Sequence, residues 1–185
     1  MFSVIWTVFR PAEVCYPRRM MIRHMTKLIP LILLAPGFLQ AGDFPIADEV
    51  IIDKSDRALH LMSDGEILRT FKIALGIQPE GDKKKEGDFR TPEGKYFLDV
   101  RNPNSDYFLS IHVSYPSAAD RREASQEGLD PGGSIMIHGQ PNLPSRSETY
   151  YRTRDWTNGC IAVSNSDMID IWLMTGHNTP IEIRP

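Results

Sequence analysis

The alternation of apolar and polar positions predicts a series of short β-strands from residue 49 onward. EVIIDKSDRALHLMSDGEILRTFKIALG, residues 49–76, predicts strands over 50–53, 58–62 and 67–75. Asp64-Gly65 lies between two alternating runs and is a strong hairpin signal, because this pair tolerates the positive φ of a tight turn. Later patterns predict strands over 95–100, 107–114, 134–139 and 180–184, with a short apolar run over 160–163.

Two segments have helical character. SAADRREASQEGLD, residues 117–130, predicts a short surface helix that ends at Gly128. Residues 167–174 predict a last helix, capped by Asn165 or Ser166 and carrying Asp167 in its first turn, where the helix dipole favours an acid. Many short strands with two or three helices indicate a mostly β domain with a few short helices, built as a sandwich or partial barrel.

Two polar segments are expected to be loops. Residues 76–94 are rich in glycine and proline, and their lysines 83–85 are interpreted as a solvated charge run, with contact to an anionic ligand as the alternative. Residues 140–158 form the second loop, which connects the strand that closes on His138 to the apolar run at Cys160. The two residues therefore lie at element boundaries on either side of one loop.

The N-terminal residues have a different organisation. MMIRHMTKLIPLILLAPGFLQAG, residues 20–42, has a basic start, a short apolar stretch and a small-residue exit, as in a secretory signal peptide cleaved after Ala41. An uncleaved anchor is the alternative. Residues 1–19 resemble neither signal nor domain, and an upstream start codon explains them. We therefore expect a leader and signal over 1–41, one globular domain over 42–185, and a periplasmic or otherwise extracytoplasmic location with membrane contact only through the export signal.

Charge restricts the partners of the expected exported domain. Residues 1–41 hold five of the 21 lysines and arginines and one of the 24 acidic residues, which leaves 16 basic and 23 acidic residues. A nucleic-acid partner requires a basic face, so this balance argues against one. At 41% hydrophobic and 24% charged residues, the chain has the composition of an ordinary globular protein.

One cysteine carries the candidate chemistry. Export removes Cys15, and the remaining Cys160 cannot form an internal disulfide, so in an oxidising compartment it is either buried or used. A nearby imidazole, such as that of His138, would lower the pKa of the thiol and carry its proton. A buried, inert cysteine is the alternative. A zinc site lacks enough ligands at close spacing, since zinc takes four, and no metal is expected.

Four sequence stretches carry a resemblance to a known family. IHGQPN at 137–142, TNGCIAVSN at 157–165, DKSDRALHLMSDGE at 53–66 and EGDFRTPEGKY at 86–96 resemble the L,D-transpeptidase catalytic domain, the YkuD family. The resemblance covers nearly all of residues 48–185 and implies an L,D-transpeptidase-like β-sandwich or partial barrel. Two positions depart from the family pattern: Asn158 stands where many members have a second histidine, and Ala162 where arginine or asparagine is common.

The resemblance implies acyl transfer on peptidoglycan without a metal or organic cofactor. Cys160 would attack the carbonyl between the L-centre of diaminopimelate and the terminal D-alanine, and His138 would take and return the proton. The carbonyl of Gly139 would orient the imidazole, and the N–H groups of Gly159 and Cys160 are the oxyanion candidates. Stem peptides would serve as donor and acceptor, and a monomer is expected.

The loop before Cys160 supplies the substrate-binding candidates. They are Thr157 and Asn158 of the motif, together with Tyr150, Tyr151, Arg152, Arg154 and Trp156. An arginine would pair with a free carboxylate of the stem, whereas Trp156 could equally anchor the loop to the core. Two alternatives remain open: a carboxypeptidase or amidase that hydrolyses the same bond or releases a stem-linked protein, and a non-catalytic wall-binding module.

Overall fold

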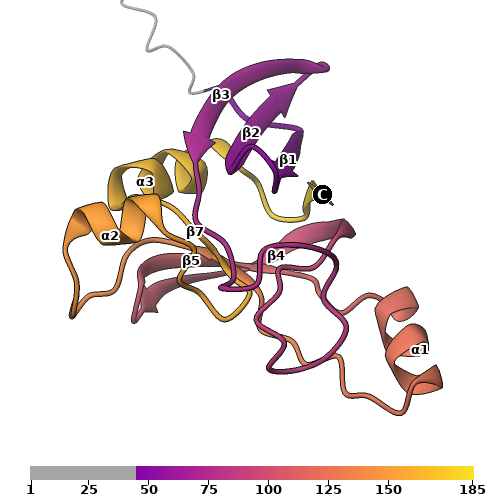
Figure 1. Ribbon diagram of the computed structural model, residues 1–185. Coiled ribbons are helices and arrows are strands. Elements are labelled where there is room, and N and C mark those ends of the chain that lie inside the picture. The colour runs from indigo at the N-terminus through magenta and orange to yellow at the C-terminus, as the bar shows by residue number, and fades with distance from the viewer. Residues whose placement is uncertain (1–44) are drawn as a thin grey trace, which may run out of the picture. The chain divides into compact units, whose positions relative to one another are not determined.

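The structure, a computed structural model, describes residues 45–185 (Figure 1). The predicted leader, signal peptide and cleavage site lie outside the described residues. Eight strands form one sheet in the order β3-β2-β1-β8-β4-β5-β6-β7. The strands are β1 Glu49–Asp53, β2 Ala58–Ser63, β3 Glu66–Lys72, β4 Gly94–Ser105, β5 Phe108–Val113, β6 Met136–His138, β7 Ile161–Ala162 and β8 Thr179–Arg184. The helices are α1 Ala118–Gln126, α2 Glu148–Thr153 and α3 Asn165–Met174. The prediction of a mostly β domain with a few short helices is confirmed.

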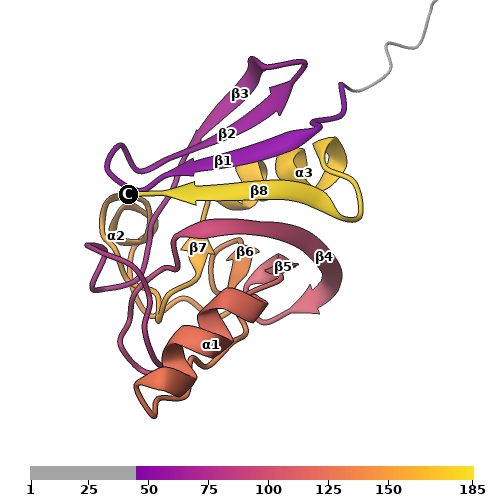
Figure 2. The ribbon, with the colours of Figure 1, turned by 90° about the vertical axis from the view of Figure 1, so that its right-hand side faces the viewer.

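The long strand β4 joins the two halves of the sheet. Its first residues, from Gly94 to Leu98, pair with β8, and its later residues pair with β5. The pairing with β5 shifts register after Leu98 and again after Asn102, and such irregularities increase the bend of a strand. Figure 2 shows β4 curving between one half made of β1, β2, β3 and β8 and another made of β5, β6 and β7.

The two ends of the sheet approach each other. Beyond β3, which ends at Lys72 rather than at the predicted residue 75, the chain crosses to β7. There the backbones of Ala74 and Ala162 exchange two hydrogen bonds of 2.8 Å, and Gly76 pairs with Thr157. The sheet is therefore almost closed into a partial barrel, and the segment just before Cys160 is bonded to the segment that follows β3.

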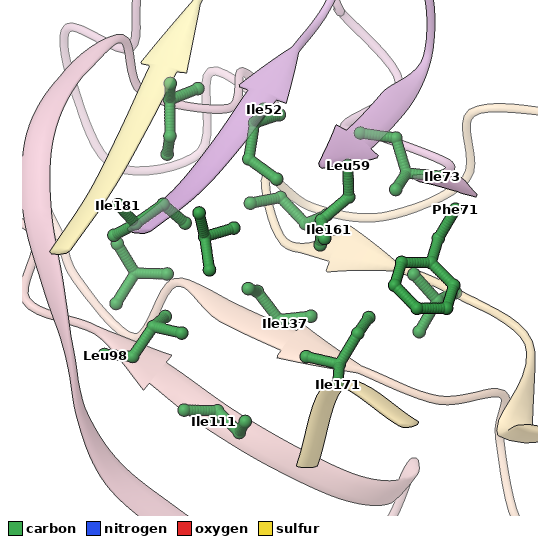
Figure 3. Close-up of a cluster of buried hydrophobic side chains, with 14 of the residues drawn as sticks. Ile52, Leu59, Phe71, Ile73, Leu98, Ile111, Ile137, Ile161, Ile171 and Ile181 are labelled. Atoms are coloured by element: carbon green, nitrogen blue, oxygen red, sulfur yellow. The ribbon is translucent and has the colours of Figure 1, made fainter. Parts of the chain in front are cut away.

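The hydrophobic core fills the space between the two halves (Figure 3). It takes Ile52, Leu59 and Phe71 from one half, and Leu98, Ile111, Ile137 and Ile161 from the other. The last helix, α3, adds Met168, Ile171 and Met174, each at most 1% exposed. Since full burial of one such side chain contributes roughly 1.5–3 kcal/mol, this core holds β6 and β7 firmly in place.

The helices differ from their predictions in detail. Ser117 and Asp120 form a capping box that begins α1, which ends at Gln126, before Gly128. The cap of α3 is Ser164, whose hydroxyl accepts from the Asp167 N–H, and not Asn165 or Ser166. Helix α2 lies inside a segment predicted to be an irregular loop; six residues are too few for a helical period to show in the sequence. None of the helices in residues 45–185 is long and apolar enough to cross a membrane.

Candidate active site

A cavity of about 490 Å³ opens where the turn between β4 and β5, the end of β6 and the segment before β7 meet. It is lined by Asn102, Asn104, Ser105, Asp106, Tyr107, Ser110, Ser134, Met136, His138, Trp156, Thr157, Asn158 and Cys160. The tertiary structure thus brings together His138 and Cys160, which the sequence separates by a long loop. Trp156, Thr157 and Asn158 are the other predicted site residues in this lining.

The parallel pairing of β6 with β7 places the imidazole and the thiol on one face. Ile137 is opposite Ile161, and both are completely buried in the core. Side chains alternate along a strand, so the residues on either side of this pair face away from the core. His138 and Cys160 are two such residues, one after Ile137 and one before Ile161, and both reach the cavity.

A backbone hydrogen bond fixes the tautomer of His138. Its Nδ1 atom lies 2.7 Å from the carbonyl oxygen of Gly139, the contact that the family resemblance implied. A carbonyl only accepts hydrogen bonds, so Nδ1 carries the proton and, in the neutral ring, Nε2 keeps its lone pair. Gly139 itself is required by packing, because a Cβ there would lie 2.6 Å from Oδ1 of Asn165.

Burial keeps both groups neutral at pH 7. Desolvation lowers the pKa of His138 to about 4, against a smaller opposing effect of the Gly139 carbonyl. Desolvation also raises the pKa of the Cys160 thiol, and the Met136 N–H and the charge of Lys83 only partly offset it. The expected lowering of the thiol pKa is therefore wrong for this structure, because loss of water outweighs the neighbouring groups. The cavity thus holds a thiol and a neutral base, and the Cys160 thiol donates to the Ser134 carbonyl, with Sγ 3.6 Å from the oxygen.

Thr157 and Gly159 shape the turn that carries the nucleophile candidate. The Thr157 hydroxyl donates to the Cys160 carbonyl at 2.7 Å and accepts from the Gly159 N–H at 3.1 Å. The Gly159 N–H is therefore already bonded within the turn. This corrects the prediction that it contributes to an oxyanion hole and leaves the Cys160 N–H as the candidate. Thr157 is buried and acts on the turn from inside, whereas Asn158 is exposed at the cavity.

The loop of residues 76–94 supports this turn from behind. Gly159 has φ +125°, and a Cβ there would lie 2.6 Å from the carbonyl oxygen of Arg90. The Asp88 carboxylate holds that backbone, accepting from the N–H groups of Lys84, Lys85 and Arg90 at 2.7–3.1 Å. Lys83 pairs with Asp88 at 2.8 Å and is buried. The interpretation of the lysine run as fully solvated is therefore wrong for Lys83, which a folded loop encloses.

The family assignment rests on the whole of this domain. Residues 47–183 match the family described as YkuD, the L,D-transpeptidase catalytic domain. The chain belongs to this family. A relative from Escherichia coli (strain K12), YafK, provisionally named as an L,D-transpeptidase, is 36% identical over an aligned length of 94 residues, and the match covers 48% of this chain and 36% of the relative.

Solved structures give the same fold. The helical cell shape determining protein Pgp2 from Campylobacter jejuni is 30% identical with a TM-score of 0.57, over 74% of this chain and 46% of its own. Bd1075 from Bdellovibrio bacteriovorus, at 23% identity and a TM-score of 0.50, is similar over 76% of this chain and 51% of its own. This chain spans less than half the length of YafK and of Pgp2.

Aromatic rings cover His138 in this L,D-transpeptidase-family domain. The Tyr107 ring lies 4.6 Å from the imidazole and the Trp156 ring 5.6 Å from it, between ring centroids. Trp156 also donates from Nε1 to the Tyr151 carbonyl at 3.2 Å, so it both lines the cavity and anchors the loop. Sequence reasoning missed Tyr107, which lies in the turn between β4 and β5 and has no distinguishing signal in the sequence.

Four predicted substrate-binding residues do not line the cavity that contains Cys160: Tyr150, Tyr151, Arg152 and Arg154. Tyr151 is buried beneath the loop, where its hydroxyl accepts from the Ser145 N–H at 3.1 Å. Arg152 is exposed on α2 and pairs with Glu148 at 3.7 Å, and Arg154 ends that helix. Helix α2, which the sequence did not predict, directs these side chains away from the cavity that contains Cys160. Within residues 45–185, no group of three His, Cys, Asp or Glu side chains is arranged to hold a metal ion.

Proposed function

We propose that this domain carries out cysteine-dependent acyl transfer on peptidoglycan stem peptides. One observation supports it above the others: an imidazole with its Nε2 lone pair available lies in the same cavity, and on the same sheet face, as the cysteine of the family motif. Membership of the L,D-transpeptidase family supplies the reaction class. The departures at Asn158 and Ala162 leave both reacting groups in place.

The neutral pair defines the order of proton movements. His138 Nε2 accepts the thiol proton as the Cys160 sulfur attacks the carbonyl between diaminopimelate and D-alanine, and the Cys160 N–H faces the oxyanion. Collapse breaks the amide bond, and the imidazolium returns the proton to the leaving D-alanine amine. The resulting thioester is then attacked by an amine of a second stem, whose proton passes to Nε2 and on to the departing sulfur, giving a cross-link. Attack by water instead gives the shortened stem.

A role in the cell wall follows from the same proposal. The signal-like residues 20–42 favour export, which would bring the domain to the assembled cell wall, where stems are cross-linked. Pgp2, a cell shape determining protein by name, has the same fold at 30% identity. In this proposal the domain acts as a monomer, with donor and acceptor stems as its partners. Neither a nucleic acid nor a cofactor takes part.

Product analysis with defined muropeptides tests the reaction. The protein is incubated with purified tetrapeptide-containing muropeptides, and products are separated and weighed by mass spectrometry. Cross-linked dimers that are lost in Cys160→Ser are expected. Shortened monomers alone would exclude transfer and establish the hydrolase alternative. No product at all, together with unaltered binding of sacculi in Cys160→Ser, would establish the wall-binding module.

Covalent capture gives a second test of the nucleophile. A carbapenem offers a strained acyl group, so incubation is expected to add the mass of the opened ring to the peptide that contains Cys160. His138→Ala should slow this addition strongly, since no other base is available at Nε2's position. An unmodified intact mass after prolonged incubation would contradict an acylating Cys160.

A further inference from the structure

A second cavity adjoins the catalytic one and carries a positive charge. Its volume is about 360 Å³, and it is lined by Tyr107, Pro141, Leu143, Ser145, Arg146, Tyr150, Tyr151 and Trp156. Tyr107 and Trp156 line both cavities, so the two spaces meet at this pair of rings. The rings are 6.0 Å apart between centroids and both contact His138. A ligand held in the second cavity therefore lies one side chain away from the catalytic base.

The two cavities have opposite charge. The catalytic cavity contains no lysine or arginine in its lining, and Asp106 is its carboxylate. A peptide with a free carboxylate would find no cationic partner there. In the adjoining cavity Arg146 is the cation, lying 5.8 Å over the ring of Tyr150. Among the ion pairs of residues 45–185, none involves Arg146, whereas Arg152 is paired with Glu148.

We propose that the adjoining cavity is a carboxylate subsite for the peptide substrate, with Arg146 as the residue that binds the carboxylate. This inference rests on the proposed function, since the ligand is a stem peptide held by a carboxylate away from the scissile bond. The guanidinium offers a planar fork of donors that matches a carboxylate, and stacking on Tyr150 orients it. Leu143 and Pro141 give this cavity an apolar rim, which suits the aliphatic part of the substrate residue that carries the carboxylate.

The assignment differs from the one that the sequence favoured. Arg152 and Arg154 are the arginines that the sequence analysis names for this role, because they lie in the loop expected to pass over the site. Helix α2 places Arg152 beside Glu148 instead, while the chain before the helix brings Arg146 to Tyr150. The sequence did not predict helix α2, and this helix decides which arginine of the loop faces the adjoining cavity.

Binding to an inactive protein isolates the subsite from catalysis. In a Cys160→Ala background, the Kd of a tetrapeptide stem is measured by calorimetry, alongside an analogue with its free carboxylates amidated. Adding Arg146→Gln is expected to raise the Kd of the free acid about 5- to 10-fold and to leave that of the amidated analogue unchanged. Arg146→Lys should retain part of the affinity, because it keeps the charge but not the fork. The matched control is Arg122→Gln, an exposed arginine on α1.

The outcomes separate the inference from the function on which it rests. Equal binding of the free acid with and without Arg146, an equal loss for acid and amidated peptide, or a loss in Arg152→Gln instead, would overturn the carboxylate subsite alone. If no stem peptide binds even when Arg146 is intact, the proposed function fails together with the subsite. A weaker Kd for the free acid that also becomes insensitive to salt in Arg146→Gln would support the charge contact directly.

Discussion

The two sides of the catalytic cavity are built on different principles. Behind Cys160, the loop of residues 76–94 is packed against Gly159 and is held by the buried pair of Lys83 and Asp88. On the substrate side, the segment before α2 is open, and Leu143 is 92% exposed. One wall is thus fixed by hydrogen bonds and an ion pair, while the other is held by a short helix and by tilted and edge-to-face aromatic rings.

A second, partly buried contact strengthens the fixed side. Asp155 accepts from the Leu75 N–H at 2.8 Å and from Arg57 at 2.8–3.2 Å, and so ties the segment before Cys160 to the segment that follows β3. The comparison indicates that precision is concentrated where the sulfur must be placed. The open side can change its conformation around a substrate at little cost in stability. The following predictions test this difference between the two sides.

The largest effect is expected at Cys160. Cys160→Ser should reduce activity by about 10⁴-fold or more, because the hydroxyl is a far weaker nucleophile beside the same base. The thermal transition should stay nearly unchanged, since the two side chains have similar size and the site is half-buried. Calorimetry together with the muropeptide assay checks both parts, and retained activity would exclude the sulfur as nucleophile.

Gly159 tests the fixed wall directly. Gly159→Ala should destabilise the domain by more than about 3 kcal/mol, because a positive φ and a close approach to a backbone carbonyl penalise any Cβ together. The control is Gly65→Ala, where φ is also positive but no atom lies within 4 Å of the added carbon. Denaturant unfolding of the two variants separates strain from collision, and equal losses would show that the Arg90 backbone yields easily.

Buried His138 makes stability depend on pH. Its native pKa is about 4, below the 6.5 of an exposed histidine, so between these values only the unfolded chain takes up the proton. Stability is therefore complete above pH 6.5 and falls by up to about 3 kcal/mol as the pH drops to 4. Asp88, whose pKa is lowered from 3.8, adds its own loss only at lower pH.

Unfolding curves across that range test the assignment. The slope between pH 6.5 and 5 should flatten in His138→Asn, which cannot take up a proton there. An unchanged slope would mean that another group causes the loss of stability.

The smallest effect is expected on the open side. Leu143→Ala should change the free energy of unfolding by less than about 0.5 kcal/mol, because the side chain is almost wholly in water. Leu75→Ala, at a fully buried position behind the site, should cost roughly 2–5 kcal/mol. A large loss at Leu143 would show that the open wall packs more tightly in solution than the comparison implies.

Local signals in the sequence were sufficient for most of the fold and for the cysteine and histidine of the candidate site. Alternation predicted the strands, and the Asp64-Gly65 pair predicted the hairpin, where both residues indeed have positive φ. The family motif identified Cys160 and His138. It could not identify Tyr107, Arg146 or the buried role of Lys83, because none of these side chains has a local pattern that distinguishes it.

The sequence by itself determined the mostly β class, the family and the cysteine–histidine pair, because each is encoded by neighbouring residues or a short motif. Only the tertiary structure decided which N–H groups of the turn remain unbonded, which arginine adjoins the candidate site and that His138 and Cys160 are both neutral. These properties depend on burial and on contacts between segments far apart in the chain. Desolvation and packing are set by the whole fold, and no window of residues contains them.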